Sequence, residues 1–344
     1  MGLFFLFFNL SSSDLYDSLV FYLKSDSVDK ASEFFLKLKE VDSLKIENYL
    51  IRAKMASLLG VEPYPVLLLR DGAGTPKFLK KSPLLIVFKE LRPPGKIGVY
   101  NLASGKEEII KLTYNKDIYP CFGETQDTIY FLRPRKRGFE LKRWIRGEGV
   151  KDIDVMKDLL SDTKDMFRFD YENGKLVFEY IDFENDGDYE LYLYDFKKDR
   201  LERLTDNIYY DRSPRFASEN KVVFCSDHVP KDEDIFLMDL VTKEIKSLVG
   251  GNEAVDIEPA FAKDKLLYVS DRDGNQEIYL KDFKMGFNIR ITYNPGKDIQ
   301  PDISSDGKWV VFQSEREGHK GLYIFSLAQP VSADSIINLI KERR

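Results

Sequence analysis

The feature that most constrains the fold is a phrase that recurs along the chain. In its last copy, Asp298-x-x-Pro301 is followed by a Ser-Asp-Gly turn, an apolar run at 309–312, a polar hairpin and a second β-type run. The same phrase opens at Asp117, Asp211 and Asp256, and a degenerate copy opens at Asp165, with Arg168 in the proline position. The spacing of the starts ranges from 42 residues (256 to 298) to 48 residues (117 to 165). A period in the forties with four short strands per repeat indicates the blades of a β-propeller.

The weaker repeats bring the number of blades to six. The first blade begins near Thr75-Pro76, and the last has only three strands after Asp298. The segment Pro65 to Arg70 has the pattern of a fourth strand, and an open ring would expose two strand edges. We therefore predict an all-β fold, a six-bladed β-propeller over residues 64–329 that is closed by strand 65–70.

The residues on either side of the propeller have helical patterns. Residues 14–63 show apolar residues at helical spacing, Leu44 among them, and Asp14 is placed to cap the first helix. The stretch 29–35 resembles part of a tetratricopeptide repeat, and a generic helical cap is the alternative. Residues 330–344 predict a C-terminal helix that begins after Ser332.

The first 13 residues are apolar and then abruptly small and polar. They resemble a short secretory signal segment, with Ser11 and Ser13 at plausible cleavage positions. The alternative is a helix that packs on the domain. No stretch approaches the ~20 apolar residues of a membrane span. We expect a periplasmic or secreted protein if the segment is cleaved, and a cytoplasmic one if it is retained.

Composition removes several classes of function. The net charge is −6 and no basic stripe is present, which argues against nucleic acid as a partner. Cys121 and Cys225 fall in different blades, so we expect two buried thiols. The chain has 2 histidines, His228 and His319, in non-adjacent blades, whereas metal-dependent propeller lyases need several imidazoles around one ion.

We predict no cofactor and no metal site. The stretch 182–188 is the one segment with calcium-like oxygen spacing, but it lacks the twelfth-position glutamate of an EF-hand loop. No nucleophile elbow, P-loop or dinucleotide-binding glycine pattern appears, so we predict no catalytic residues.

The repeated aspartates and prolines should gather near one end of the central channel. One hypothesis is an acidic ring that binds a cation or a basic peptide. The other, which we favour, is that each carboxylate hydrogen-bonds backbone N–H groups of its own turn and tethers neighbouring blades. The prolines fix φ at the entrance of the innermost strand, where a missing N–H is tolerated. The residues concerned are Asp117, Asp165, Asp211, Asp256 and Asp298, with Pro120, Pro214, Pro259 and Pro301.

The repeats from Asp256 to Tyr279 and from Asp298 to Lys308 resemble those of the TolB-type β-propeller, the six-bladed module of a periplasmic protein of the Tol-Pal envelope system. The resemblance covers about residues 64–327 and is most specific in blades four to six. Residues 1–63 are too short and too helical to be the α/β domain that precedes the propeller in TolB. The resemblance implies a platform for protein partners in the cell envelope, lipoproteins among them.

We therefore predict a non-catalytic propeller that presents rigid loops to a protein partner. A hydrolase or lyase that uses the channel as its active site is one alternative, and a cytoplasmic interaction protein is another, because the fold alone does not assign function. The candidate contact residues lie in two hairpins: Asp271, Arg272, Asp273, Asn275, Glu315, Arg316, Glu317 and His319.

Overall fold

The computed structural model describes residues 10–90, 96–110, 112, 116–136, 139–153, 164–182, 188–229, 232–251 and 253–343. The apolar start of the predicted signal segment (1–9) and the centre of the candidate calcium stretch (183–187) lie outside these residues. Among the helices described, none is long and apolar enough to cross a membrane.

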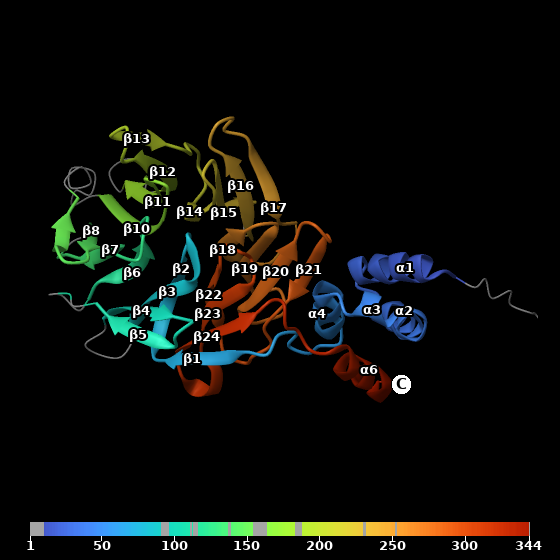
Figure 1. Ribbon diagram of the computed structural model, residues 1–344. Helices are drawn as coiled ribbons and strands as arrows, with labels where there is room; N and C mark the ends of the chain where they lie inside the picture. The colour runs from blue at the N-terminus through green and yellow to red at the C-terminus, as the bar shows by residue number, and fades with distance from the viewer. Residues whose placement is uncertain are drawn as a thin grey trace, which may run out of the picture.

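The described residues form six four-stranded antiparallel sheets, which are arranged as blades around a centre (Figure 1). The prediction of a six-bladed propeller is confirmed. In blades one to five, the strands follow one another outward in chain order, so the first strand of each blade is the innermost. Blade one comprises β2 (Ala73–Leu79), β3 (Ser82–Glu90), β4 (Ile97–Asn101) and β5 (Lys106–Ile109); blade two comprises β6 (Ile118–Phe122), β7 (Thr128–Pro134), β8 (Phe139–Ile145) and β9 (Gly149–Asp152); blade three comprises β10 (Lys164–Glu172), β11 (Lys175–Asp182), β12 (Tyr189–Asp195) and β13 (Arg200–Arg203).

Blade six differs from the others because its outermost strand comes from the opposite end of the chain. β1 (Leu67–Asp71) pairs antiparallel with β24 (Gly321–Ser326). This is the position expected for the predicted strand 65–70, so the first strand of the chain closes the ring. The remaining strands are β14 (Asp211–Ser218), β15 (Lys221–Val229), β16 (Asp232–Asp239) and β17 (Ile245–Val249) in blade four; β18 (Asp256–Ala262), β19 (Lys265–Ser270), β20 (Glu277–Asp282) and β21 (Phe287–Arg290) in blade five; and β22 (Asp298–Ile303) and β23 (Trp309–Ser314) in blade six, where a 3-10 turn, η1 (Arg316–Gly318), precedes β24.

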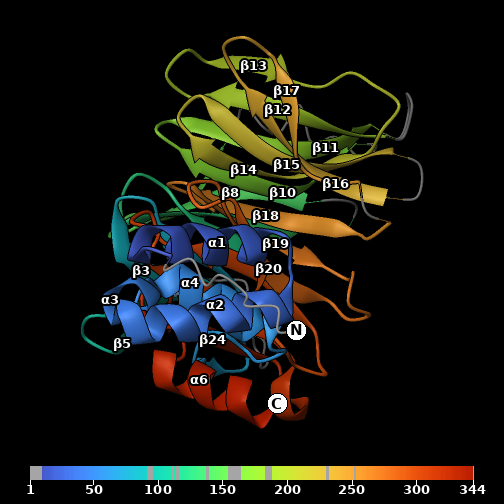
Figure 2. The same cartoon turned by 90° about the vertical axis from the view of Figure 1, so that its right-hand side faces the viewer.

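The helices lie at the outer edge of the ring beside blades five and six (Figures 1 and 2). They are α1 (Ser12–Lys24), α2 (Val28–Val41), α3 (Ser43–Ile46), α4 (Tyr49–Leu58) and the C-terminal α6 (Ala333–Glu342). Ser332 caps α6 as expected, because its side chain accepts a hydrogen bond from Ser335 N. The expected cap of α1 was wrong by three residues: Ser11 is the N-cap, and Asp14 completes a capping box with it.

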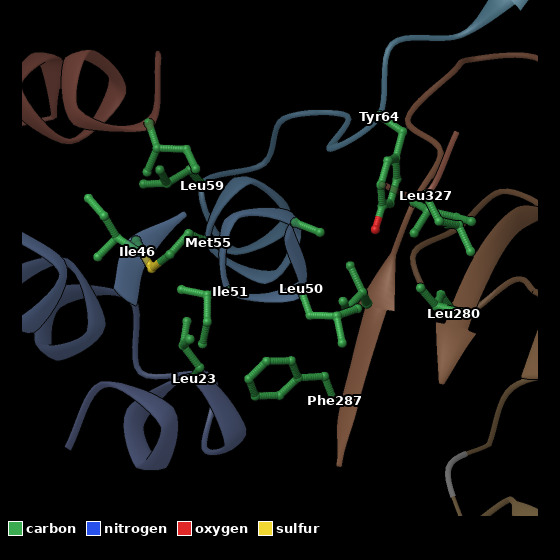
Figure 3. Packing of buried hydrophobic residues seen from close by; sticks show 14 of the residues in the cluster. Leu23, Ile46, Leu50, Ile51, Met55, Leu59, Tyr64, Leu280, Phe287 and Leu327 are labelled. Carbon is green, nitrogen blue, oxygen red and sulfur yellow. The ribbon is translucent and has the colours of Figure 1, made fainter. Parts of the chain in front are cut away.

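The helical segment and the propeller share one hydrophobic core (Figure 3). Leu50 and Ile51 of α4 are buried in the same cluster as Leu280 and Phe287 of blade five. We expected Leu44 to belong to a buried helical face, but it is 82% exposed, because α3 is a single turn whose Ile46 is buried instead. The helices are therefore a covering of the outer edge of blades five and six.

Polar contacts join the same two parts. The side chain of Lys54 is buried, and its Nζ donates to the Asn288 carbonyl of β21 at 2.6 Å. At the start of the propeller, Glu62 forms an ion pair with Arg316 of the last hairpin. A buried lysine needs such partners because burying an unpaired charge is costly.

Candidate functional site

Each innermost strand enters the central channel with the same irregularity. In every blade the pairing of the first two strands shifts register close to the Pro-equivalent position. The residue just before the proline has a positive φ in blades one, two, four, five and six: Thr75, Tyr119, Ser213, Glu258 and Gln300. Non-glycine residues in this region are uncommon and persist where the surroundings hold them in place. The Asp-x-x-Pro phrase thus encodes a β-bulge that directs residues to the channel.

The bulges line an open cavity in the channel. The apolar surface of this cavity comes from Pro76 and from the four predicted prolines, Pro120, Pro214, Pro259 and Pro301. The polar groups lie between the prolines. Lys77 and Arg215 come from the residue after the proline in blades one and four. A largely apolar cavity with a few converging polar groups is the usual form of a binding site.

Blade three breaks the ring of prolines, because Arg168 occupies the proline position. Its guanidinium crosses to the next two blades, where Nη1 donates to Ser213 Oγ at 2.5 Å and Nη2 to Glu258 Oε1 at 2.9 Å. Burial would lower the pKa of Arg168, but Glu258 and Glu179 more than offset it, so the arginine stays charged. The damaged copy of the repeat therefore adds a third cation, beside Lys77 and Arg215, to the lining of the channel cavity.

A line of hydrogen bonds continues from Arg168 around the ring. Glu258 Oε2 accepts from Gln300 N at 2.7 Å, and Gln300 Oε1 accepts from Thr75 N at 3.0 Å. These bonds link blades three, four, five, six and one through the residues with positive φ. They satisfy backbone N–H groups that the bulges remove from the strand ladders.

A second group of charges is buried beside the cavity. Arg215 forms an ion pair with Asp302 and lies 3.5 Å from Asp170, and Lys77 also lies 3.5 Å from Asp170. Burial alone would raise the pKa of Asp170, but the neighbouring cations, Lys80 and Arg215 first among them, hold that pKa below its usual range. The cations are thus neutralised by carboxylates from blades three and six.

The predicted aspartates lie at the start of the innermost strands, and those whose side chains are described bind within or next to their own blades. Asp117 accepts from Arg133 at 2.8 Å, Asp256 from Arg272 at 2.8 and 2.9 Å, and Asp298 from Arg316 at 3.0 Å. Asp211 accepts from Asn207 instead. The side chain of Asp165 lies outside the described residues. Within the described part of the chain, no three histidine, cysteine or acidic side chains are grouped as a metal site.

The two candidate contact hairpins are partly engaged inside the molecule. Arg272 packs its guanidinium over Tyr279, 4.6 Å from the ring centre, and Asn275 Nδ2 donates to the Asn294 and Gly296 carbonyls. In the second hairpin Arg316 holds Asp298 and Glu62. The exposed members are Asp271, Asp273, Glu317 and His319, and Asp273 is paired with Arg290. Glu315 is exposed in part and paired with Lys320.

The mouth of the channel at blades three and four carries a further surface, outside the two predicted contact hairpins. Ile208 is 82% exposed and Tyr210 is 41% exposed, both in the segment that joins these blades. Arg212 lies over the rings of Tyr189 and Tyr210 and pairs with Glu233. We call Tyr189, Ile208, Tyr210 and Arg212 the mouth surface.

The mouth surface adjoins an open hollow. Tyr189, Arg212 and Glu233 line this hollow, together with Arg168 and Ser213, which also line the channel cavity. His228, predicted to lie in a surface hairpin, packs against Tyr209, with ring centres 4.2 Å apart and ring planes tilted by 54°. The run Ile208-Tyr209-Tyr210 between two strands was the signal in the sequence, because apolar side chains are unusual in such a connection.

Comparison with known proteins agrees with this fold. Residues 169–332 match the family model of the TolB beta propeller domain. The Tol-Pal system protein TolB of Desulfosudis oleivorans is 38% identical over 72 residues, which cover 21% of this chain and 16% of that protein. TolB of Helicobacter pylori is 22% identical over 126 residues, 36% of this chain and 30% of that protein. The chain thus matches less than a third of the length of either relative.

Solved structures show the same architecture at low identity. The TolB structure from Acinetobacter baumannii aligns with a TM-score of 0.54 at 14% identity, covering 70% of this chain and 57% of that one. The tricorn protease aligns with a TM-score of 0.55 at 15% identity, covering 77% of this chain and 26% of that one. Since an enzyme is found beside TolB, the architecture is shared by proteins of different function.

Proposed function

Because the chain contains a TolB-type six-bladed β-propeller, we propose that it is a non-catalytic scaffold that binds a protein partner in the cell envelope. The observation that carries the proposal is the mouth surface, where the exposed side chains of Ile208 and Tyr210 adjoin Tyr189 and Arg212, two of the residues that line a hollow. The location follows the Tol-Pal system proteins that the chain resembles.

The composition of the mouth surface favours a protein over a small metabolite. Tyrosine and arginine are enriched in the energetically important parts of protein interfaces. Here Arg212 is held over two tyrosine rings and by Glu233, so little side-chain freedom would be lost on binding. Ile208 projects beside them as an apolar residue with no cover among the described residues.

The pairing of the groups in the channel supports a non-catalytic role. Ser213 Oγ accepts a hydrogen bond from Arg168, a charged guanidinium that does not act as a general base. Burial raises the pKa of both Cys121 and Cys225 to about 11, so neither is a thiolate nucleophile at neutral pH. The channel cations bind carboxylates of the protein itself.

Site-specific photocrosslinking in intact cells tests the proposal. A photoreactive amino acid would replace Ile208 in one variant and Leu44 in a matched control, since both side chains are 82% exposed. We expect a discrete crosslinked protein from position 208 and none from position 44. Ile208→Asp should prevent capture of that protein from envelope extracts, whereas Leu44→Asp should not. Equal crosslinking from both positions would contradict the proposal. So would crosslinks at position 208 that attach only small molecules and no protein.

A further inference from the structure

Two cations from opposite blades line the channel cavity. Lys77 of blade one and Arg215 of blade four each follow a proline of the ring, and both belong to the lining of the cavity. They come together at one carboxylate, because Lys77 Nζ and Arg215 Nε each lie 3.5 Å from a carboxylate oxygen of Asp170. We call Lys77 and Arg215 the cation pair.

The carboxylates that neutralise the cation pair are not part of the cavity wall. Asp170 lies beside both cations, and Asp302 forms an ion pair with Arg215. Both carboxylate side chains are buried, and neither residue is among those that line the cavity. The two cations therefore stand between their carboxylates and the cavity, so the wall at this point consists of N–H donors.

The other charged and amide groups of the wall also leave donors for a ligand. Glu258 is the one carboxylate among the described lining residues, and both of its oxygens are engaged, Oε1 by Arg168 and Oε2 by Gln300 N. Gln300 Oε1 accepts from Thr75 N, so its amide NH₂ is the group that remains to bind a ligand. A molecule that supplies acceptor oxygens matches this wall.

The electrostatics of the cation pair favour added negative charge. Burial and the nearby charge of Arg215 lower the pKa of Lys77, while Asp170 and Asp302 act in the opposite direction. A negative charge placed in the cavity beside Lys77 and Arg215 would favour the protonated lysine. The pair can therefore stabilise an anion that enters the cavity.

We propose that the channel cavity binds a carboxylate that is attached to an apolar body. The carboxylate lies at Lys77 and Arg215, which bind it through charge-assisted hydrogen bonds. The apolar body packs against the five prolines of the wall. This carboxylate site is separate from the mouth surface, and it does not depend on the proposed function.

A single negative charge suits the site better than a double one or a cation. Asp170 and Asp302 already neutralise the cation pair, so a phosphate dianion would bring more charge than the wall compensates. A metal ion would face Lys77 and Arg215 directly, and within the described part of the chain no group of acidic, histidine or cysteine side chains forms a metal site.

Two kinds of molecule carry a carboxylate of this type, a small free acid and the C-terminus of a peptide. The cavity and the hollow at the mouth have Tyr119, Arg168 and Ser213 in common in their linings, so the two spaces adjoin. Either kind of molecule can approach the cation pair along this line.

Titration of the full chain with butyrate at pH 7.5 tests the site. The readout is the ε-carbon resonance of Lys77 in protein labelled at lysine, and butyramide, which has nearly the same shape without the charge, is the matched control. We expect a saturable shift with butyrate and none with butyramide. Acetate should bind on the order of tenfold more weakly than butyrate, because it lacks two methylene groups that the prolines would cover.

A peptide acid distinguishes the two sources. Acetyl-glycyl-valine with a free C-terminus is titrated beside its amide under the same conditions. Tighter binding of the peptide acid than of butyrate identifies a chain terminus as the ligand. Peptide binding that is absent or no tighter identifies a free acid. The absence of a Lys77 shift with both acids would overturn the proposal.

Two lysine variants, measured by calorimetric titration with butyrate, check the position of the site. Lys80 Nζ lies 3.6 Å from Asp170, as Lys77 Nζ lies 3.5 Å from it, but Lys80 does not line the cavity. Lys77→Met should weaken butyrate binding at least about tenfold. Lys80→Met should change it by less than about threefold. If Lys77→Met does not fold, the comparison of butyrate with butyramide on the unaltered chain still decides the matter.

Three further results would overturn the proposal. These are an equal response to butyramide, tighter binding of inorganic phosphate than of butyrate, and a loss of butyrate binding in Lys80→Met but not in Lys77→Met. Ile208→Asp separates the carboxylate site from the proposed function, since it should prevent partner capture and leave butyrate binding intact. Normal butyrate binding with no partner at position 208 would remove the proposed function only.

Discussion

Blades four and five have the same arrangement of strands and the same bulge, yet their buried carboxylates differ in whether an arginine of the same blade binds them. In blade five, Arg272 donates a hydrogen bond to the carboxylate of Asp256, and Arg290 donates one to the carboxylate of Glu277. In blade four, the two arginine positions are occupied by His228 and Ser247. The strand pattern alone is therefore enough to build a blade. The arginine-carboxylate network is a separate property, which one blade can lose.

The largest effect is expected from removing the hairpin arginine of blade five. Arg272→Ala removes two hydrogen bonds to fully buried Asp256 and the contact with the Tyr279 ring, so we expect a loss of about 3 kcal/mol in the free energy of unfolding. Chemical denaturation measures the loss. His228→Ala in blade four, the matched change, should cost less than about 1 kcal/mol. Equal losses would mean that the two blades do not differ in this respect.

A smaller loss is expected at the second arginine. Arg290→Ser gives blade five the residue of blade four, and it removes the charged hydrogen bond to Glu277 and the bond to the Thr292 carbonyl. We expect a cost of about 2 kcal/mol in the same denaturation experiment. Ser247→Ala should stay within about 0.5 kcal/mol. A negligible cost for Arg290→Ser would show that the buried Glu277 does not need an arginine at this position, which in blade four is occupied by a serine.

The smallest effect is expected at Asp234, which pairs with Ser226 in blade four as Glu277 pairs with Ser270 in blade five, and it depends on pH. The pKa of Asp234 in the folded protein is raised to about 6 by burial and by Asp232. Between about pH 4 and pH 6 the folded state therefore binds more protons than the unfolded state, and the stability falls as the pH rises. Asp234→Asn removes this loss.

The variant should match the wild type near pH 4 and be more stable above pH 6.5, by on the order of 1 kcal/mol. Denaturation curves at both pH values provide the measurement. An advantage of the variant that is the same at pH 4 and pH 7 would show that the charge of Asp234 is already compensated.

The sequence predicts the ring well because its signals are local and repeated. Asp256, Pro259 and the Asp273-Gly274 turn each lie within one blade, so four recurrences of the same spacing are enough to identify strands and count blades. Their detailed role was harder to predict. We expected the aspartates to bind backbone N–H groups of their own turns and to tether neighbouring blades, whereas the side chains of Asp256 and Asp298 bind arginines of their own blades.

The links between blades come from residues that vary from copy to copy. Glu258 and Gln300 bind across blade boundaries because the bulge turns them toward the channel, and their identities follow no repeat. Arg168 was noticed as a defect in the phrase, but its partners Ser213 and Glu258 are 45 and 90 residues away. The packing of α4 on β21 is likewise a contact between distant segments, which an apolar helix face does not specify.

The closure of blade six by β1 has a consequence for synthesis on the ribosome. The strand at Leu67–Asp71 is made long before its partner at Gly321–Ser326, which begins 250 residues after the strand ends (71 to 321). The apolar faces of α1 to α4 also wait, because their core neighbours Phe287, Leu327 and Ile336 follow more than 200 residues later. The nascent chain therefore carries an unpaired strand and uncovered helices through most of its elongation. A chaperone that shields residues 12–71 until the last blade emerges would therefore protect this protein more than a chaperone that shields one of the middle blades.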